Sequence, residues 1–256
     1  MKTVLITGST SGIGLGIARE FAKTKKYQII FNGLETNGPD IAASIGKEFG
    51  IDVMYSPANM LKPEELRNMV SEGLAKFGKI DVLINNAGIQ HVSPIEDFPD
   101  DKWLAIIGIN LNSAFYLCKA VWPGMKANKF GRIINIASAH GLVASEFKSA
   151  YVASKHGIVG LTKTLGLEGA PFNITCNAIC PGYVKTPLVE KQIADQAKAH
   201  NLSEEDVISK VMLMKQAVKE FVSVETLGQM ALLLADERSN TITGTALPID
   251  GGWNAQ

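Results

Sequence analysis

Cysteine is scarce in this sequence, and neither sign of charge is in excess. The 256 residues include three cysteines, Cys118, Cys176 and Cys180, which are too few and too scattered for a disulfide framework and lack the spacing of metal ligands. Basic and acidic residues number 25 each, so the chain has no general electrostatic attraction to nucleic acid or to an anionic membrane. We therefore expect reduced core cysteines, a cytoplasmic location, and no nucleic-acid or membrane partner.

Long apolar runs, repeats and low-complexity linkers are also missing. We find no apolar run of membrane-spanning length and expect no signal peptide, because a strand pattern begins directly after Met1. With 46% hydrophobic residues, the chain has enough apolar side chains for one sizeable core. We expect one α/β domain over residues 1–256.

The N-terminus carries a glycine-rich turn between a strand and a helix. Residues 3–7 are apolar and β-branched, the turn contains Gly8, Gly12 and Gly14, and an amphipathic pattern follows up to Phe21. Glycines permit a tight turn and a close approach, and a helix N-terminus offers unpaired N–H groups to phosphates. The pattern predicts a nucleotide-binding turn.

The second predicted strand, Tyr27–Asn32, lacks the acidic residue that usually binds the adenosine ribose of NAD at this position. Asn32, Gly33 and Leu34 stand there instead, and Glu35 lies one step beyond. Neither this segment nor the glycine turn contains an Arg or Lys that would pair with a 2′-phosphate. We therefore expect a preference for NAD over NADP.

Strand and helix patterns alternate along the rest of the chain, which predicts one open, doubly wound, mostly parallel sheet flanked by helices. The further expected helices are 39–49, 63–77 and a long one from residue 100, and the further strands are 51–55, 81–85, 132–137, 174–180 and 247–250. Every candidate site segment, namely 8–14, 85–90, 138–140 and 181–186, falls at the carboxyl ends of strands. That edge is where ligands bind in such sheets.

The stretch from Ser138 to Lys155 carries the candidate chemistry. Tyr151 and Lys155 are four residues apart on a predicted helix and so share one face. An ammonium beside a phenol favours phenolate, which would lower the pKa of Tyr151 and make it a general acid/base. Ser138, at the end of the preceding strand, would hold a substrate oxygen. The alternative is an ordinary amphipathic helix face.

Other polar residues leave two interpretations open. Asn110 interrupts an apolar helix pattern and is either a structural bridge or part of a proton relay. His91 is either a solvated loop residue or a site residue. Residues 188–221 are predicted to be helical, with Ser203 as an N-cap, and form either a substrate lid or a surface helix pair.

Five ordered motifs give the whole chain a resemblance to the short-chain dehydrogenase/reductase family. They are the Thr7–Gly14 turn, Asn85-Asn86-Ala87-Gly88, Asn110, Ser138 with Tyr151-x-x-x-Lys155, and Pro181-Gly182. The resemblance implies Tyr151 as acid/base, Ser138 orienting the substrate, Lys155 lowering the tyrosine pKa and binding nicotinamide ribose, and Asn110 holding a relay water. The cofactor residues it implies are Gly8, Thr10, Ser11, Gly12, Ile13, Gly14, Phe31, Asn59, Met60, Asn86, Ala87, Gly88, Tyr151, Lys155, Pro181, Gly182, Val184 and Thr186.

Within that family, the stretches 86–91, 136–142, 180–182 and 186–192 are similar to those of D-3-hydroxybutyrate dehydrogenases. This resemblance implies reversible, NAD-dependent oxidation of D-3-hydroxybutyrate to acetoacetate. It also implies that Gln90, His140, Lys148 and Gln192 hold the substrate carboxylate, together with Ser138 and Tyr151 on the reacting oxygen. A buried anion needs a cation and several donors, which this set supplies.

The chain departs from the family pattern at Asn59, where an Asp is usual, and at Tyr183, where the subfamily has a Trp. Two alternatives are an NADPH-dependent 3-oxoacyl thioester reductase and a non-catalytic nucleotide-binding scaffold. The resemblance further implies a homotetramer. In some relatives the terminal residue, here Gln256, meets magnesium or calcium at a subunit junction.

Overall fold

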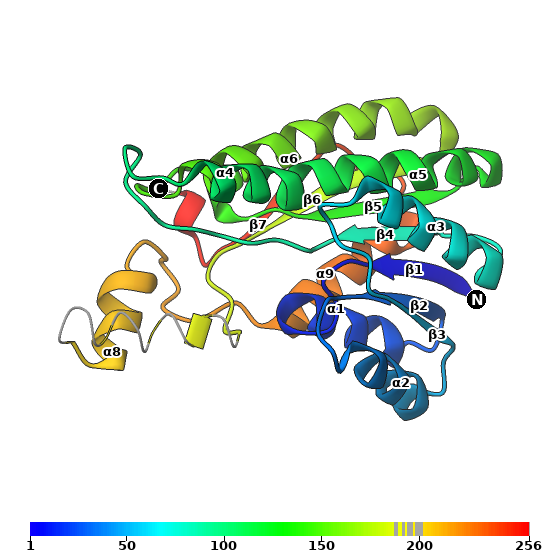
Figure 1. Cartoon of the computed structure of the whole chain (residues 1–256), viewed down its shortest axis with the longest axis horizontal. Coiled ribbons are helices and arrows are strands. Elements are labelled where there is room, and N and C mark those ends of the chain that lie inside the picture. The colour runs from blue at the N-terminus through cyan, green and yellow to red at the C-terminus, as the bar shows by residue number, and fades with distance from the viewer. Residues whose placement is uncertain (187–188, 191–192, 194–196, 198–201, 256) are drawn as a thin grey trace.

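A computed structural model describes residues 1–186, 189–190, 193, 197 and 202–255. Seven parallel strands form one sheet in the order β3-β2-β1-β4-β5-β6-β7 (Figure 1). The strands are β1 Lys2–Ile6, β2 Tyr27–Asn32, β3 Val53–Ser56, β4 Val82–Asn85, β5 Gly131–Ile136, β6 Ile174–Pro181 and β7 Ala246–Ile249. The strand order reverses between β1 and β4, which is where a doubly wound sheet opens its binding crevice. The predicted fold class is confirmed.

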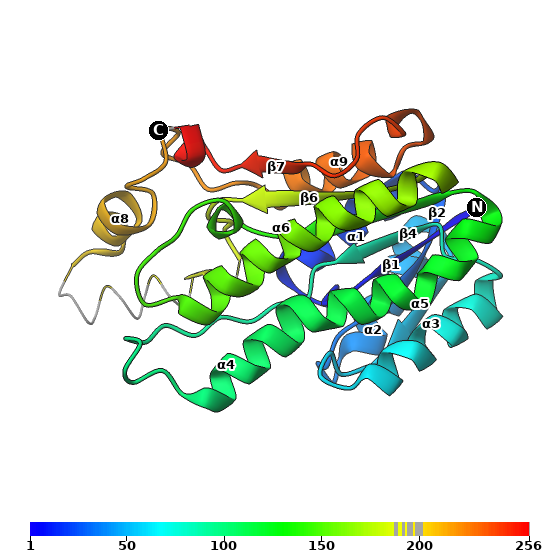
Figure 2. The ribbon, with the colours of Figure 1, turned by 90° about the horizontal axis from the view of Figure 1, so that it is seen from above.

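Helices cover both faces of the sheet (Figures 1 and 2). One face carries α1 Gly12–Lys23, α2 Gly38–Phe49 and α9 Val224–Ala235, and the other carries α3 Pro63–Phe77, α4 Asp100–Ile107, α5 Ser113–Asn128 and α6 Ser149–Gly169. The alternation of side chains along β1 shows how the layers form. Val4 and Ile6 join the core under α1 and α9, whereas Leu5 joins the core under α3 and α5.

The three cysteines lie in these cores. Cys118, Cys176 and Cys180 are buried free thiols, as expected from their scattered spacing. Burial raises the pKa of Cys118 to about 12 and that of Cys180 to about 11, so these thiols stay protonated at neutral pH. The three cysteine side chains therefore contribute to packing in the protein interior.

Strand β3 begins two residues later than the sequence predicts. The backbone N–H of Ile51 donates to the Gly46 carbonyl at 3.1 Å, so Ile51 helps to close α2. Gly50 ends that helix with φ at 66°, in the left-handed region that favours glycine. The apolar Ile51 therefore belongs to the helix end, and the ladder with β2 starts at Val53.

The long helix predicted from residue 100 contains a π-helical turn, Gly108–Asn112, between α4 and α5. By length and composition, Asp100–Asn128 is apolar enough to cross a membrane, because an 18-residue window within it has a mean hydropathy of 1.5. The expectation that no segment would meet this criterion is therefore wrong. In the fold, Leu117, Val121 and Met125 of this segment are buried against the sheet, which is the position of a core helix.

Residues after β6 are only partly as predicted. Ser203 caps α8 Glu204–Val207 by accepting a hydrogen bond from the Asp206 N–H at 3.0 Å, and a π-helical turn, Ile208–Met212, follows. Residues 213–221 are irregular, which contradicts the helix expected there. Here a side chain supplies hydrogen bonds that backbone N–H groups would supply in a helix. The Gln216 amide donates to the backbone carbonyls of Val218 and Glu220.

Candidate active site

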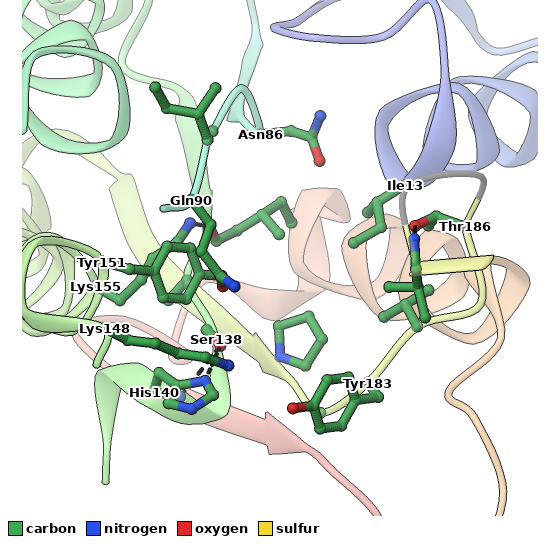
Figure 3. Close-up of a pocket in the computed structure, with 18 of the residues that line it drawn as sticks. Ile13, Asn86, Gln90, Ser138, His140, Lys148, Tyr151, Lys155, Tyr183 and Thr186 are labelled. Carbon is green, nitrogen blue, oxygen red and sulfur yellow. Dashed lines mark hydrogen bonds between the residues drawn. The ribbon is translucent and has the colours of Figure 1, made fainter. Parts of the chain in front are cut away.

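A cavity of about 210 Å³ opens at the carboxyl edge of the sheet. Figure 3 shows Tyr151, Ser138 and Lys148 on one side of this cavity and Ile13 and Thr186 on the opposite side. The predicted site residues that line it are Ile13, Asn86, Gly88, Gln90, Ser138, His140, Lys148, Tyr151, Lys155, Pro181, Gly182, Val184 and Thr186. Ile89, Ile136, Ala137, Tyr183, Val189 and Trp253 complete the lining.

The glycine turn forms one wall and has the tight geometry that its residues require. Gly8 has φ at 59°, and a Cβ on Gly14 would lie 2.2 Å from the Gly8 carbonyl oxygen. The Asn86 side chain donates to the carbonyls of Thr7 and Gly8 at 2.9 and 3.0 Å. This cradle, with the N-terminus of α1 behind it, fits the diphosphate of a dinucleotide.

Asn32 explains why β2 ends without an acid. Its side-chain oxygen accepts from the Gly8 N–H at 3.2 Å, and its amide donates to the carbonyls of Ser56 and Ala58 at 3.1 and 2.9 Å. The side chain is 2% exposed. Asn32 therefore ties the glycine turn to β3, a role that needs both a donor and an acceptor and that a carboxylate cannot fill.

The side chains of Ser138, Tyr151 and Lys155 line the same cavity. Ser138 follows β5, and the other two share one face of α6, as the four-residue spacing predicts. The Lys155 ammonium lies 5.5 Å from the centre of the Tyr151 ring and donates to the Ile136 carbonyl at 2.8 Å. That bond fixes a buried ammonium between the phenol and the end of β5.

The acid–base properties of this set differ from one prediction. Burial raises the pKa of the Tyr151 phenol, and a hydrogen bond with Ser138 opposes that shift. The net direction is opposite to the lowered Tyr151 pKa that the sequence predicts. Burial also lowers the pKa of Lys155 to about 8, so its own charge is costly in this enclosed site.

Asn110 acts as a structural bridge in this structure. From the π-helical turn, its side-chain oxygen accepts from the Ile89 N–H at 2.9 Å, and its amide donates to the Ile89 carbonyl at 3.0 Å and to the Ser154 hydroxyl at 3.1 Å. These bonds fix the loop that carries Gln90 into the cavity. They leave the relay role of Asn110 as a prediction.

His140 packs beside the reacting oxygens. Its Nε2 lies 2.8 Å from the Ser145 hydroxyl, its Nδ1 lies 3.5 Å from the Ser138 hydroxyl, and its backbone N–H donates to Ser138 at 3.1 Å. Burial and then the charges of Lys148 and Lys215 lower the pKa of His140 to about 4. His140 is thus a neutral ring that holds Ser138 in place at physiological pH.

An aromatic wall with a cation forms the outer end of the cavity. Tyr183 and Trp253 stack with ring centres 5.9 Å apart, and the Lys148 ammonium lies 5.9 Å from the Tyr183 ring. His140 meets Trp253 edge-on at 5.1 Å. Trp253 is a lining residue that the sequence did not predict, although its position directly after the Asp250-Gly-Gly turn places it at the carboxyl edge of the sheet.

Several predicted cofactor residues lie away from the cavity. Phe31 and Met60 are buried in the core, and Asn59 is used in a turn, where its side chain accepts from the Leu61 N–H. His91 does not line the cavity and meets Phe98 edge-on. Gln192 and Gln256 are outside the described residues. Within the described part of the chain, no group of three His, Cys, Asp or Glu side chains is arranged for a metal, and the C-terminal metal contact stays a prediction.

Comparison with known proteins defines the class that the fold and site point to. A model of the short chain dehydrogenase family matches residues 2–197, and the chain belongs to this family of oxidoreductases. Over its full length it is 52% identical to the D-beta-hydroxybutyrate dehydrogenase of Rhizobium meliloti and 49% identical to that of Cupriavidus necator, covering 99% and 98% of those proteins.

A solved structure extends the comparison to the fold. The chain superposes on an actinorhodin polyketide ketoreductase with NADPH at a TM-score of 0.93 and 30% identity, covering 100% of this chain and 98% of the other. The family and this neighbour together support a nicotinamide cofactor. The resemblance found in the sequence motifs is confirmed.

Proposed function

We propose that this protein is an NAD-dependent dehydrogenase that interconverts D-3-hydroxybutyrate and acetoacetate. The observation that carries the proposal is the position of Lys148, whose ammonium shares one cavity with the Ser138 and Tyr151 hydroxyls. A small hydroxy acid brings an alcohol to be oxidised and a carboxylate to be held. The cavity offers a hydroxyl pair for the first and a cation with Gln90 for the second.

Each of these residues has its own role in the proposed reaction. Ser138 holds the substrate oxygen, and Tyr151 takes the hydroxyl proton during oxidation and returns it during reduction. A nicotinamide cofactor held by the glycine turn and Lys155 would supply the hydride chemistry at the carbinol carbon. Lys155, whose ammonium lies 5.5 Å from the centre of the Tyr151 ring, places a positive charge beside the negative charge that develops on the phenol oxygen when the phenol releases its proton.

The segment 188–221 acts as a substrate lid in this proposal. Val184 pairs with Val222 in an isolated parallel bridge, which brings the two ends of the segment together beside the cavity. Ile193, Val207 and Met212 form a small buried cluster of their own with Tyr183 and Val189. Closure would exclude water and bring Gln192 to the carboxylate.

We further propose a cytoplasmic homotetramer. The helices α4, α5 and α6 expose large apolar side chains, including Leu104 at 68%, Phe115 at 46% and Leu167 at 78%. Such side chains along adjacent helices are what a second copy would cover. This supports the assembly expected from the family resemblance.

The rival is an NADPH-dependent 3-oxoacyl thioester reductase, because a ketoacyl reductase of Streptomyces virginiae is 35% identical over 98% of this chain. Its substrate is a thioester and has no carboxylate for Lys148. Steady-state rates with D-3-hydroxybutyrate, its L-isomer, 3-hydroxy thioesters and both nicotinamides distinguish the two. We expect the D-acid with NAD to give the highest kcat/KM, and a higher value for a thioester with NADP would overturn the proposal.

A further inference from the structure

Phe147 has a backbone conformation that bulky residues rarely adopt. Its φ is 62°, in the left-handed region that favours glycine and asparagine, and it forms a turn with Glu146. In the part of the chain that the structure describes, the other non-glycine residues with positive φ are Lys25, Lys129 and Asn173. Each of those follows the end of a helix, where a left-handed residue is common. Phe147 instead stands directly before a helix, α6, whose N-cap residue lines the cavity.

The side chain of Phe147 does not explain this conformation. It is 54% exposed, so packing of the ring in the core does not offset the cost of a left-handed backbone. The turn is held through its backbone, because the Ser93 N–H donates to the Phe147 carbonyl at 2.9 Å. The N-cap residue of α6, Lys148, makes no capping hydrogen bond through its side chain. The bond from Ser93 therefore holds the point at which the chain enters α6.

This turn lies among the side chains that the proposed function places on the substrate. At its start, the Ser145 hydroxyl is 2.8 Å from Nε2 of His140, and at its end Lys148 reaches into the cavity (Figure 3). Ser93 belongs to the loop that carries Gln90 to the same cavity. The turn thus joins three segments that each bring a polar side chain to the site.

Lys148 depends on such support more than the other two side chains. A lysine has a flexible four-carbon stem, so its ammonium reaches a fixed point reproducibly only from a fixed backbone. Burial, and then the charge of Lys215, lowers the pKa of Lys148, so the ammonium is held where its charge is costly. A change of φ at residue 147 rotates the chain that follows, beginning with Lys148.

We propose that Phe147 is a positioning residue whose left-handed backbone, held by the Ser93 N–H, directs the Lys148 ammonium to the substrate carboxylate. The inference rests on the proposed function, in which Lys148 binds that carboxylate. The Phe147 ring has no part in this role. Activity should therefore follow how readily residue 147 adopts a positive φ, and not its size or polarity. Glycine and asparagine adopt this conformation readily, whereas β-branched valine does not.

Three replacements test this order, namely Phe147→Gly, Phe147→Asn and Phe147→Val, with kcat/KM measured on D-3-hydroxybutyrate and on a neutral 3-hydroxy ester. The glycine and asparagine variants should stay within a few-fold of wild type on both substrates. The valine variant should lose about 10- to 100-fold on the acid and far less on the ester, as expected when one contact is misplaced by about 1 Å. Phe147→Ala should fall between asparagine and valine, and it replaces the valine variant if that protein does not fold.

Lys129→Val is the matched control. Lys129 also has a positive φ, 49°, but it ends α5 at the amino edge of the sheet, away from the cavity. This variant carries the same unfavourable backbone and should leave the ratio of acid to ester kcat/KM unchanged. A shift of that ratio equal to the shift in Phe147→Val would overturn the proposal. So would equal losses on the acid in Phe147→Asn and Phe147→Val, because the ring would then be what matters.

A double variant separates positioning from general destabilisation. If Phe147 acts through Lys148, the valine replacement has little left to remove once Lys148→Ala has deleted the ammonium. Phe147→Val combined with Lys148→Ala should then match Lys148→Ala alone on the acid. Losses that multiply in the double variant would overturn the proposal.

Binding of butyrate, which has the carboxylate but no hydroxyl, distinguishes this inference from the proposed function. We would titrate the NADH complexes of wild type and the variants with butyrate and follow the heat. Binding weakened by Phe147→Val and not by Phe147→Asn, in a protein that does not oxidise D-3-hydroxybutyrate, would overturn the substrate assignment and support the role of Phe147. Oxidation of D-3-hydroxybutyrate with butyrate binding that is equal in wild type and Phe147→Val would overturn the role of Phe147 alone.

Discussion

Gln216 accepts a hydrogen bond from the backbone N–H of Tyr183 at 3.2 Å and is itself 1% exposed. The bond ties the irregular residues 213–221 to the loop that carries one wall of the cavity. A Cβ on Gly182 would lie 2.7 Å from the same Gln216 oxygen, so the contact also depends on a glycine. Gln216 thus fixes the point at which the proposed lid meets the site.

Replacing Gln216 with Leu should destabilise both the fold and the closed site. The change keeps the side-chain volume but leaves the Tyr183 N–H and two carbonyls without partners, which costs about 1–3 kcal/mol. We expect a lower urea midpoint and a KM for D-3-hydroxybutyrate raised several-fold, with NADH affinity within twofold of wild type. An unchanged midpoint and an unchanged KM would show that this contact does not organise the lid.

Lys148→Ala and Gln192→Ala should each lower kcat/KM for D-3-hydroxybutyrate by about one to three orders of magnitude, because each removes a contact to a buried carboxylate. The substrate carboxylate does not react, but the energy of binding it can be used to lower the barrier of the chemical step. We therefore expect kcat to fall together with substrate affinity. Lys163→Ala, an exposed lysine on α6, is the matched control. The informative comparison uses a neutral 3-hydroxy ester: equal losses on ester and acid would mean that these residues do not read the carboxylate.

Acid should destabilise the protein partly through His140. Its pKa is lowered from 6.5 to about 4, so between these values the unfolded chain binds a proton that the folded protein excludes. Stability from the neutral ring is therefore present above pH 6.5 and is lost as the pH falls toward 4, by at most about 3 kcal/mol. Melting curves of wild type and His140→Gln between pH 7.5 and 4 should converge toward low pH. Parallel curves would contradict this account of the buried ring.

Assembly should depend on the exposed apolar side chains of the α4–α6 helices. Light scattering should give a mass four times the chain mass of 27.5 kDa. Leu167→Lys, at a side chain that is 78% exposed, should lower that mass and leave the monomer fold intact, because a buried charge at an interface is costly and an exposed one is not. A wild type that is monomeric at micromolar concentration would contradict the tetramer.

The sequence predicted the fold well, and it also predicted that Ser138, Tyr151 and Lys155 lie at one cavity, for identifiable reasons. The elements Tyr27–Asn32 and Pro63–Phe77 begin and end where their hydrophobic periods and flanking residues place them. Tyr151 and Lys155 share a helix face because helical spacing alone brings them together. The clustering of loops at one edge follows from parallel strands, whatever the side-chain detail.

What the sequence did not predict depends on contacts between distant segments. Glu35 was noted only as one step beyond the expected acid, because its hydrogen bond with Thr10 depends on a backbone that the Tyr55 hydroxyl holds at Gly33 from another strand. The use of Gln216 in place of a helix for residues 213–221 depends on Gly182 and the turn at Gly251. Likewise, the raised pKa of Tyr151 reflects burial, which spacing does not reveal.

Tyr151 is the proposed acid/base of an NAD-dependent oxidation of D-3-hydroxybutyrate. The most direct test of this role is the turnover of Tyr151→Phe, measured alongside a titration of the same variant with NADH. The variant keeps the ring that packs against His140 and loses only the hydroxyl. We predict that kcat is lowered by about 10²- to 10⁴-fold and that NADH affinity is unchanged. Turnover within a few-fold of wild type would contradict the account.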